Sequence, residues 1–482
     1  MKRRLLALFI VVSALIPGGG DVNAQPAAGT KPPAAGALRP YVLPAVQTFT
    51  LENGMRVLLV ERHSLPIVTA RFVVDAGAVR EPADKNGLAY LTADLLSEGA
   101  AGLTSAQMAE KMADLGAQFG TSANNGSAFV TVTALPNVFT EALTIGATAL
   151  TNPTLSPVEF DRMRTSAIAA YQQGQSTVNG IASKIFYKAI YDPGTAYSRL
   201  SGGTTASLTK LTRDDVVNWH KAMYSPKNTT LVLIGDLTVE SARVAAEKAV
   251  GKWNTPGPSL TPFVGKGLAS SENRVILVDR PGSVQSAILV GHSTAGYETP
   301  ELLPMTAAGR VLGGGFSSRI NMLLREKKGW TYGAFAQFNP LKGVGSFFIN
   351  SSIRSNATDS ALAESVREFR RLATEPVPSV ELADQLTNVV ASFPSSVQTI
   401  QGLMGRLNDV VVYGLPLDYY NTYRERLAAV KPEDISRAGA ALLKPNGLTI
   451  VAVGDLKTIE APVRALNLGT VEVWDNDGNK IR

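Results

Sequence analysis

Residues 211–237 read LTRDDVVNWHKAMYSPKNTTLVLIGDL, and residues 430–456 read VKPEDISRAGAALLKPNGLTIVAVGDL. The two stretches align without a gap at an offset of 430 − 211 = 219 residues, and both end in Gly-Asp-Leu after an apolar run. A second match joins residues 56–62 (RVLLVER) to residues 274–280 (RVILVDR), at an offset of 218. Two matches at nearly the same offset indicate that the chain contains one kind of domain in duplicate.

Within each half, strand and helix patterns come in clusters and do not alternate strictly. Two alternating apolar stretches, residues 48–51 and 55–61, are joined at Asn53-Gly54 and predict a hairpin. Further strands are expected at residues 66–74, 129–134 and 229–235, and helices at residues 87–98, 105–115, 137–150 and 157–173. This pattern predicts an α+β fold of two homologous domains, each a mainly antiparallel sheet with helices covering one face.

Composition sets the expected domain boundaries. Residues 254–273 are rich in Pro, Gly and Ser and predict a linker between an N-terminal domain, 45–253, and a C-terminal domain, 274–470. Residues 471–482 are expected to form a tail. Residues 25–44 are rich in Pro and Ala, which is typical of a flexible linker.

The first 24 residues have the pattern of a secretory signal peptide. Three basic residues, 2–4, precede an apolar run over residues 5–16, which is too short for stable membrane insertion. Val22-Asn23-Ala24 then places small residues where a signal peptidase reads them, so cleavage is expected to leave Gln25 as the N-terminus. The predicted location is the periplasm. The alternative is an uncleaved N-terminal anchor.

Composition excludes several classes of chemistry. The 482 residues include no cysteine, which excludes disulfides, thiolate zinc sites and cysteine nucleophiles. Lys and Arg number 46 against 40 Asp and Glu, and this small, dispersed excess argues against nucleic-acid binding.

The polar motifs also indicate little chemistry. The stretch from Gly291 through Ser293 to Ala295 lacks the last glycine of a hydrolase nucleophile elbow, and no histidine follows it. The three histidines, His63, His220 and His292, have no histidine or carboxylate at the helical spacing that metal ligands need, so structural or surface roles are expected.

Residues 87–100 read GLAYLTADLLSEGA, and here the chain resembles the pitrilysin/insulinase family of zinc peptidases, which includes the mitochondrial processing peptidase. Active members carry Gly-Leu-Ala-His-x-x-Glu-His in this helix, the inverted zinc motif. The resemblance covers nearly the whole predicted mature chain. It extends to residues 51–57 (LENGMRV), 75–78 (DAGA), 224–228 (YSPKN), 312–319 (LGGGFSSR) and 324–332 (LREKKGWTY).

The resemblance fails at the catalytic positions. The two zinc-binding histidines correspond to Tyr90 and Asp94, and the catalytic glutamate corresponds to Ala93. The third ligand, a glutamate on a later helix, is expected at Ala169 or Ala170, and neither has a donor atom. Because a zinc site needs three or four ligands, the resemblance implies no catalytic residue and no metal site in this chain.

The resemblance also implies a substrate-binding pair, Arg325 and Tyr332, seven residues apart. Arg325 is expected near the end of a helix, Gly329 at a chain reversal, and Tyr332 at the start of the next strand. Both side chains could donate hydrogen bonds to peptide carbonyls. By spacing alone, the alternative is structural, with Arg325 complementing a helix C-terminus and Tyr332 packed.

Together these features imply the non-catalytic, substrate-binding subunit of a heterodimeric periplasmic zinc-dependent endopeptidase. The expected partner is a homologous subunit that carries the zinc, and the expected substrates are peptides. The alternative is a purely structural or peptide-binding protein that has no peptidase partner.

Overall fold

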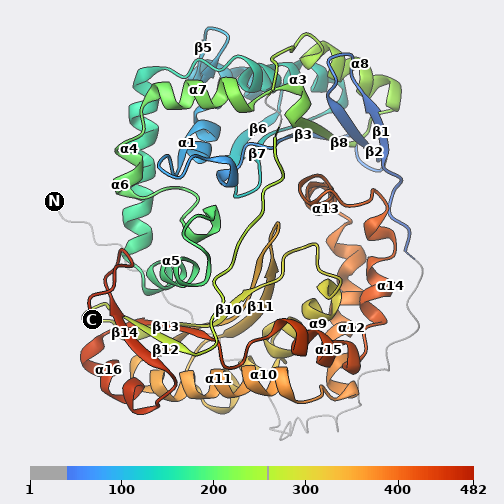
Figure 1. Ribbon diagram of the computed structural model, residues 1–482. Coiled ribbons are helices and arrows are strands. Elements are labelled where there is room, and N and C mark those ends of the chain that lie inside the picture. Colours follow the sequence, from blue (N-terminus) through green and yellow to red (C-terminus); the bar gives the residue numbers. More distant parts are fainter. Residues whose placement is uncertain (1–40, 258–259) are drawn as a thin grey trace, which may run out of the picture. The chain divides into compact units, whose positions relative to one another are not determined.

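The computed structural model describes residues 41–257 and 260–482 (Figure 1). The predicted signal peptide, residues 1–24, and most of the predicted linker, 25–44, lie outside these residues. The described chain contains two six-stranded sheets, one built from residues 47–235 and the other from residues 274–474.

The first sheet has the strand order β1-β2-β8-β3-β7-β6. Its strands are antiparallel neighbours except for the parallel pair β2–β8. The strands are β1 Gln47–Thr50, β2 Arg56–Glu61, β3 Val68–Val74, β6 Gln118–Ala123, β7 Ala128–Ala134 and β8 Thr229–Gly235, and a small separate sheet joins β4 Gly99–Ala100 to β5 Leu103–Thr104. The helices of this half are α1 Leu88–Leu95, α2 Ser105–Asp114, α3 Pro136–Thr151, α4 Pro157–Gln175, α5 Val178–Ile190, α6 Thr205–Leu208, α7 Arg213–Met223 and α8 Val239–Val250, with 3-10 turns η1 Ala78–Arg80, η2 Ala196–Ser198 and η3 Pro226–Asn228.

The second sheet has the order β11-β12-β10-β13-β9-β14, and its parallel pairs are β13–β9 and β14–β9. Its strands are β9 Arg274–Asp279, β10 Gln285–Thr294, β11 Ala334–Pro340, β12 Gly345–Arg354, β13 Thr449–Gly454 and β14 Thr470–Trp474. The helices are α9 Leu302–Gly313, α10 Arg319–Asn321, α11 Thr358–Thr374, α12 Ser379–Ser396, α13 Ile400–Tyr413, α14 Tyr423–Ala428, α15 Pro432–Leu442 and α16 Leu456–Ala465, with a π-helical turn η4 Met322–Lys327 and 3-10 turns η5 Ser355–Ala357 and η6 Tyr419–Asn421.

The topology confirms the duplication. Read from one end, β2, β8, β3, β7 and β6 of the first sheet correspond in order and direction to β9, β13, β10, β12 and β11 of the second. The sheets differ in the strand beside β2 or β9, which is β1 in the first half and β14 in the second. β14 pairs in parallel with β9, so residues 470–474 belong to the second sheet although the sequence predicts a tail from residue 471.

Both faces of each sheet are buried. In β2, Val57 and Leu59 belong to the core formed with the helices of the first half, whereas Leu58 and Val60 belong to a core on the other face. In β9, Val275 and Leu277 likewise belong to one core, and Ile276 and Val278 belong to a core on the other face. Because successive strand residues point to opposite faces, a continuous apolar run such as RVLLVE supplies two cores at once.

The second face of each sheet is covered by a helix from the other half. α5, from the first half, packs on β10 and β13, while α13, from the second half, packs on β8 and β3 (Figure 1). The sequence predicts helices on one face only. Burial of apolar surface stabilises a fold by about 25 cal/mol per Å². This gain explains why the remaining apolar face of each sheet is also covered.

Local signals explain where several helices begin. Thr104, Thr212 and Thr238 each accept a hydrogen bond from a backbone N–H three residues later, and a side chain at that later residue bonds back to the threonine N–H. These capping boxes satisfy two otherwise unpaired donors at each helix start. Within residues 41–257 and 260–482, no helix has the length and apolar character needed to cross a membrane.

Candidate functional site

Helix α1 carries the positions of the inverted zinc motif, and its start is held by a buried carboxylate. Glu81 accepts hydrogen bonds from the backbone N–H of Gly87, at 3.2 Å, and of Ala89, at 2.6 Å. Gly87 has a φ of +97°, and a Cβ there would come within 2.9 Å of the Leu208 side chain. The chain therefore needs glycine at this position to turn into α1.

Among the three motif positions, 90, 93 and 94, only one holds an acidic group. Ala93 is fully buried, and Tyr90 packs against the first core. Asp94 is partly buried, and burial, together with the neighbouring charge of Glu98, raises its pKa to about 6. Asp94 offers the only carboxylate among these positions, so α1 supplies at most one zinc ligand.

Helix α4 offers no further ligand. Its inward residues, Phe160, Met163, Ala167 and Ile168, pack against the first core, whereas Ala169 and Ala170 are exposed. In residues 41–257 and 260–482, no group of three or more His, Cys, Asp or Glu side chains could hold a metal ion. The donor set that remains on α1 and α4 does not fit zinc.

The acidic group next to Asp94 is already paired. Glu98, which follows α1, forms an ion pair with Arg162 of α4 at 2.5 Å, and Arg162 also contacts Glu159 at 2.6 Å.

Tyr224 is fully buried near this site, and its hydroxyl has no hydrogen-bond partner in the described residues. Burial, with the nearby Asp94 charge, raises the pKa of Tyr224. The sequence offers no signal that a tyrosine 130 residues downstream would lie near Asp94.

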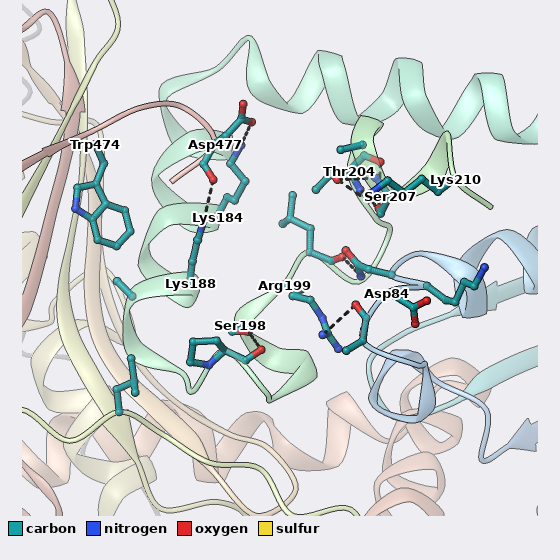
Figure 2. A pocket seen from close by; sticks show the side chains of 18 of the residues that line it. Asp84, Lys184, Lys188, Ser198, Arg199, Thr204, Ser207, Lys210, Trp474 and Asp477 are labelled. Carbon is teal, nitrogen blue, oxygen red and sulfur yellow. Dashed lines mark hydrogen bonds and ion pairs between the residues drawn. The ribbon is translucent and has the colours of Figure 1, made fainter. Parts of the chain in front are cut away.

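A large cavity borders the loop that leads into α1 (Figure 2). Its volume is about 830 Å³, and its walls come from that loop, α5, α6, and strands β9 and β14. Figure 2 shows Lys184, Lys188 and Trp474 on one side of the view and Lys210 on the other. No sequence motif marks these residues, because they come from segments far apart in the chain.

The predicted substrate-binding pair lies near the π-helical turn η4. Arg325 is part of η4 and is 41% exposed; its guanidinium lies 4.8 Å from the ring centre of Phe316, and its Nε lies 3.3 Å from Glu326. Gly329 has a φ of +61°, as expected for the chain reversal. The structure therefore leaves Arg325 accessible while two neighbours already contact it.

Tyr332 differs from the expectation in its position. Strand β11 begins at Ala334, so Tyr332 lies in the preceding loop, where it is 91% exposed. In the described part of the chain, its side chain forms no hydrogen bond and no ring contact, with Arg325 or with any other residue. The loop is held instead by Thr331, whose hydroxyl donates to Gly333 O and accepts from Gly333 N. Tyr332 is therefore accessible to a binding partner.

His292 is buried and His220 is partly buried, and both have hydrogen-bond partners. His220 Nε2 lies 2.8 Å from Leu150 O, and burial lowers the pKa of His220. His292 Nδ1 lies 2.7 Å from Ser293 O, and its Nε2 accepts from Lys444 N at 3.0 Å. Burial lowers the pKa of His292 to about 4. Both histidines are structural.

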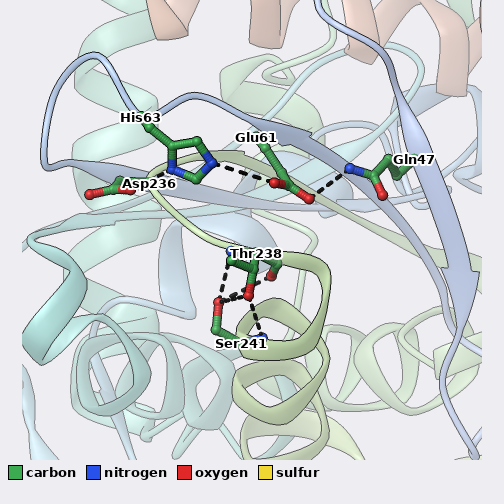
Figure 3. Close-up of polar contacts among 6 residues, drawn as sticks. All are labelled: Gln47, Glu61, His63, Asp236, Thr238 and Ser241. Carbon is green, nitrogen blue, oxygen red and sulfur yellow. Dashed lines mark hydrogen bonds and ion pairs between the residues drawn. The ribbon is translucent and has the colours of Figure 1, made fainter.

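His63 is exposed between two carboxylates (Figure 3). Its Nδ1 lies 2.6 Å from Asp236 and its Nε2 lies 3.4 Å from Glu61. Hydrogen bonds to Asp236 and then to Glu61 raise the pKa of His63. The two carboxylates bind opposite sides of the ring, so the three groups do not surround a common metal position. Residues 63 and 236 are far apart in sequence, and only the parallel pairing of β2 with β8 brings them together.

Strand β6 forms a free edge beside α1. β6 pairs with β7 on one side, and on its other side no strand pairs with it in the described residues. Gln118, Gly120 and Ser122 are exposed along it, and α1 packs next to it. An edge strand with unpaired N–H and C=O groups can accept another extended segment.

Two family models match the chain. Residues 56–202 match the model described as insulinase, peptidase family M16, and residues 210–389 match the model described as the peptidase M16 inactive domain. Both halves of the chain belong to the M16 peptidase family. The resemblance inferred from residues 87–100 and the later segments is thus confirmed.

Relatives of this chain include proteins named as non-peptidase homologues and proteins named as zinc proteases. The chain is 22% identical to the non-peptidase homolog YmxG of Helicobacter pylori over 408 residues, which cover 83% of this chain and 92% of that protein. It is 21% identical to the zinc protease PqqE of Helicobacter pylori over 430 residues, 85% of this chain and 93% of that protein. The solved peptidase M16 inactive domain from Pseudomonas fluorescens superposes with a TM-score of 0.79 at 25% identity, over 85% of this chain and 98% of that one. With the donor atoms missing from α1 and α4, these matches identify a non-catalytic, peptidase-like M16 protein.

Proposed function

We propose that this M16 protein is the substrate-binding subunit of a heterodimeric zinc-dependent endopeptidase. The observation that carries the proposal is an M16 fold whose zinc-binding positions hold Tyr90, Ala93 and Asp94, while the neighbouring strand β6 has no strand paired on its outer side in the described residues. A chain with no zinc ligands of its own gains a role in proteolysis when a homologous partner supplies the metal and the water-activating glutamate.

The peptide-binding part of the proposal rests on two features. Edge strand β6 can pair with an extended peptide through main-chain hydrogen bonds, as in β-strand addition. Arg325 and Tyr332 are both accessible and can donate to peptide carbonyl groups. Peptide substrates fit this arrangement because both features recognise backbone groups.

The proposed partner is a homologous M16 subunit that carries zinc. One strain of Helicobacter pylori contains both a protein named a non-peptidase homolog and one named a zinc protease, and each aligns with most of this chain. By analogy, an organism that makes this chain would also make the zinc-bearing counterpart. The competing function is that of a structural or peptide-binding protein without a peptidase partner.

The proposed location is the periplasm, and it follows from the signal-peptide pattern of residues 1–24 alone. Mass spectrometry of the protein recovered from a periplasmic extract is expected to find Gln25 at the N-terminus. Recovery of a chain that still begins at Met1 would contradict this part of the proposal.

The decisive experiment reconstitutes the complex with the zinc-bearing homologue and measures steady-state peptide cleavage. A hydrogen bond from a charged donor is worth about 1.5–3 kcal/mol, so Arg325→Ala should lower kcat/KM of the complex by roughly 10- to 150-fold. Tyr332→Phe removes a neutral hydrogen bond and should cost a few-fold to about tenfold. The matched control is Lys327→Ala, because Lys327 is exposed on the same turn and has no charged partner in the described chain.

Size-exclusion chromatography and the zinc content of the partner check assembly in every variant, and neither should change. If Arg325→Ala and Lys327→Ala complexes both keep the wild-type kcat/KM, the pair has only a structural role. Failure of the two chains to assemble would favour the competing function, a structural or peptide-binding protein that acts alone.

A further inference from the structure

The cavity beside α1 is strongly basic. Six of its lining side chains are cationic and two are acidic; the cations are Lys85, Lys184, Lys188, Arg199, Lys210 and Arg274, and the acids are Asp84 and Asp477. A cavity of about 830 Å³ is within the range that encloses a small organic ligand or a few residues of peptide. The imbalance of charge indicates that an occupant would be anionic.

Two of the six cations are already neutralised by carboxylates. Lys85 Nζ lies 3.0 Å from Asp215, and Lys184 Nζ lies 3.6 Å from Asp477 and donates to Tyr171 Oη at 3.1 Å. These pairs fix the positions of the cavity walls. The other four lining cations have no such carboxylate partner in the described residues.

The other four cations have no carboxylate within 4 Å in the described chain. Lys188 donates to the carbonyl of Asp477 at 3.1 Å, and Arg274 donates to Ala189 O at 2.8 Å. Lys210 is exposed and forms no side-chain hydrogen bond or ion pair. The guanidinium of Arg274 also lies 5.7 Å from the ring centre of Trp474. Neither a carbonyl nor an aromatic ring carries a negative charge that would neutralise a cation, so each of these groups remains available to an anion.

Arg199 is the most informative of the four. Within the described residues, its only side-chain hydrogen bond runs from Nη1 to Ala83 O at 3.4 Å, and its Nε is buried without a partner. Glu81 is close enough to interact electrostatically with Arg199 but lies beyond ion-pair distance. Arg199 as a whole is partly exposed, but a buried N–H without an acceptor is costly. A carboxylate in the cavity would provide that acceptor.

The arrangement of charges and apolar surface limits the chemistry of the occupant. Lys188 and Arg274 come from α5 and β9, whereas Arg199 and Lys210 come from the segments before and after α6. Figure 2 shows Lys188 and Lys210 on opposite sides of the view. A ligand with one charged end would satisfy one wall only. The lining also includes Trp474, Leu200, Leu268 and Pro193, which favour an apolar body. The occupant therefore needs at least two separated carboxylates on a partly apolar body.

We infer that this cavity binds a short acidic peptide segment, with two acidic side chains flanking a pair of apolar ones. The site is separate from the Arg325 and Tyr332 pair and is complete within this chain. If the cavity does not bind an acidic peptide, the heterodimer proposal is unaffected. If the two subunits do not assemble, the proposed cavity site is likewise unaffected.

The test is isothermal titration calorimetry on the isolated mature chain with a capped peptide, acetyl-Ala-Glu-Leu-Phe-Glu-Ala-amide. A second peptide with Gln in place of both Glu residues is expected to bind at least about tenfold more weakly, because it lacks charge-assisted hydrogen bonds. Arg199→Gln should weaken binding of the acidic peptide by about tenfold or more. Lys210→Gln should weaken it by about twofold to fivefold, because its charge is exposed and screened.

Lys248→Gln is the matched control and should leave binding unchanged, because Lys248 is exposed on α8 and does not line the cavity. Thermal unfolding checks the fold of each variant. Lys210→Gln keeps the test decisive if Arg199→Gln unfolds, because Lys210 is exposed and bonds nothing. Absence of peptide binding would overturn the inference, as would equal binding of the two peptides or unchanged affinity in both cavity variants. Competition by inorganic phosphate or decanoate at the same concentrations would also overturn it, assigning the cavity to simple anions or to fatty acids.

Discussion

Asp94 is the last acidic group on the motif face of α1, and replacing it with Asn should stabilise the protein in a pH-dependent way. Burial raises the pKa of Asp94 from 3.8 to about 6, with a smaller contribution from Glu98. At about 1.36 kcal/mol per pH decade, this difference corresponds to at most about 3 kcal/mol between the protonated and ionised forms. Because Asp94 is partly exposed, solvent screening should reduce the value to about 1–2 kcal/mol.

The sign follows from proton linkage. The folded state holds the Asp94 proton more tightly than the unfolded state does, so the favourable contribution of this group is fully present below pH 3.8. It is lost as the pH rises through about 6. Asn has no proton to lose, so the advantage of Asp94→Asn over the wild type should grow from pH 4.5 to pH 8 by about 1–2 kcal/mol.

The assay is urea unfolding of the wild type and of Asp94→Asn at several pH values in that range. Asp114→Asn is the matched control, since Asp114 is exposed on α2 and forms no ion pair. Its free energy of unfolding should follow the wild-type pH profile. If Asp94→Asn and the wild type also give parallel profiles, the burial argument for Asp94 is refuted, even if a constant difference separates them.

Three further outcomes are expected. In NMR titrations, His63 should have a pKa above 6.5, and Asp236→Asn should lower it more than Glu61→Gln, because Asp236 makes the larger contribution; equal values in all three proteins would contradict the paired geometry. Gly313→Ala should lower the free energy of unfolding by about 1–3 kcal/mol, since its Cβ would overlap the backbone of β11, whereas Gly315→Ala, which has no atom within 4 Å of the added Cβ, should be near neutral. Elemental analysis of the purified chain should find far less than one zinc per chain, and a stoichiometric zinc that survives a mild chelator would refute the loss of the site.

Much of the local structure follows from sequence periodicity. The Asn53-Gly54 turn joins β1 to β2 as predicted, and the expected helices at residues 105–115, 137–150 and 157–173 correspond to α2, α3 and α4 within a few residues. These elements depend on contacts within one or two turns of chain, which the residue pattern records directly. The duplication is equally visible, because corresponding strands repeat their apolar runs.

The neighbourhood of the candidate sites depends on contacts that the residue pattern does not record. The sequence predicts Tyr332 in a strand, but strand pairing with β12 begins only at Ala334 and leaves Tyr332 in a loop. The exchange of α5 and α13 between the halves is also absent from the pattern, because an amphipathic helix does not specify which sheet it covers.

The sequence by itself determined the M16 duplication and the loss of the zinc ligands, because the identity of a side chain decides whether it has a donor atom. Only the tertiary structure decided which charges meet. His63 and Asp236 are brought together by parallel pairing of β2 and β8, and Arg199 and Arg274 line one cavity because α5 crosses onto the second sheet. Electrostatic interactions depend on distance in space, and the distance between residues far apart in the chain is set by packing.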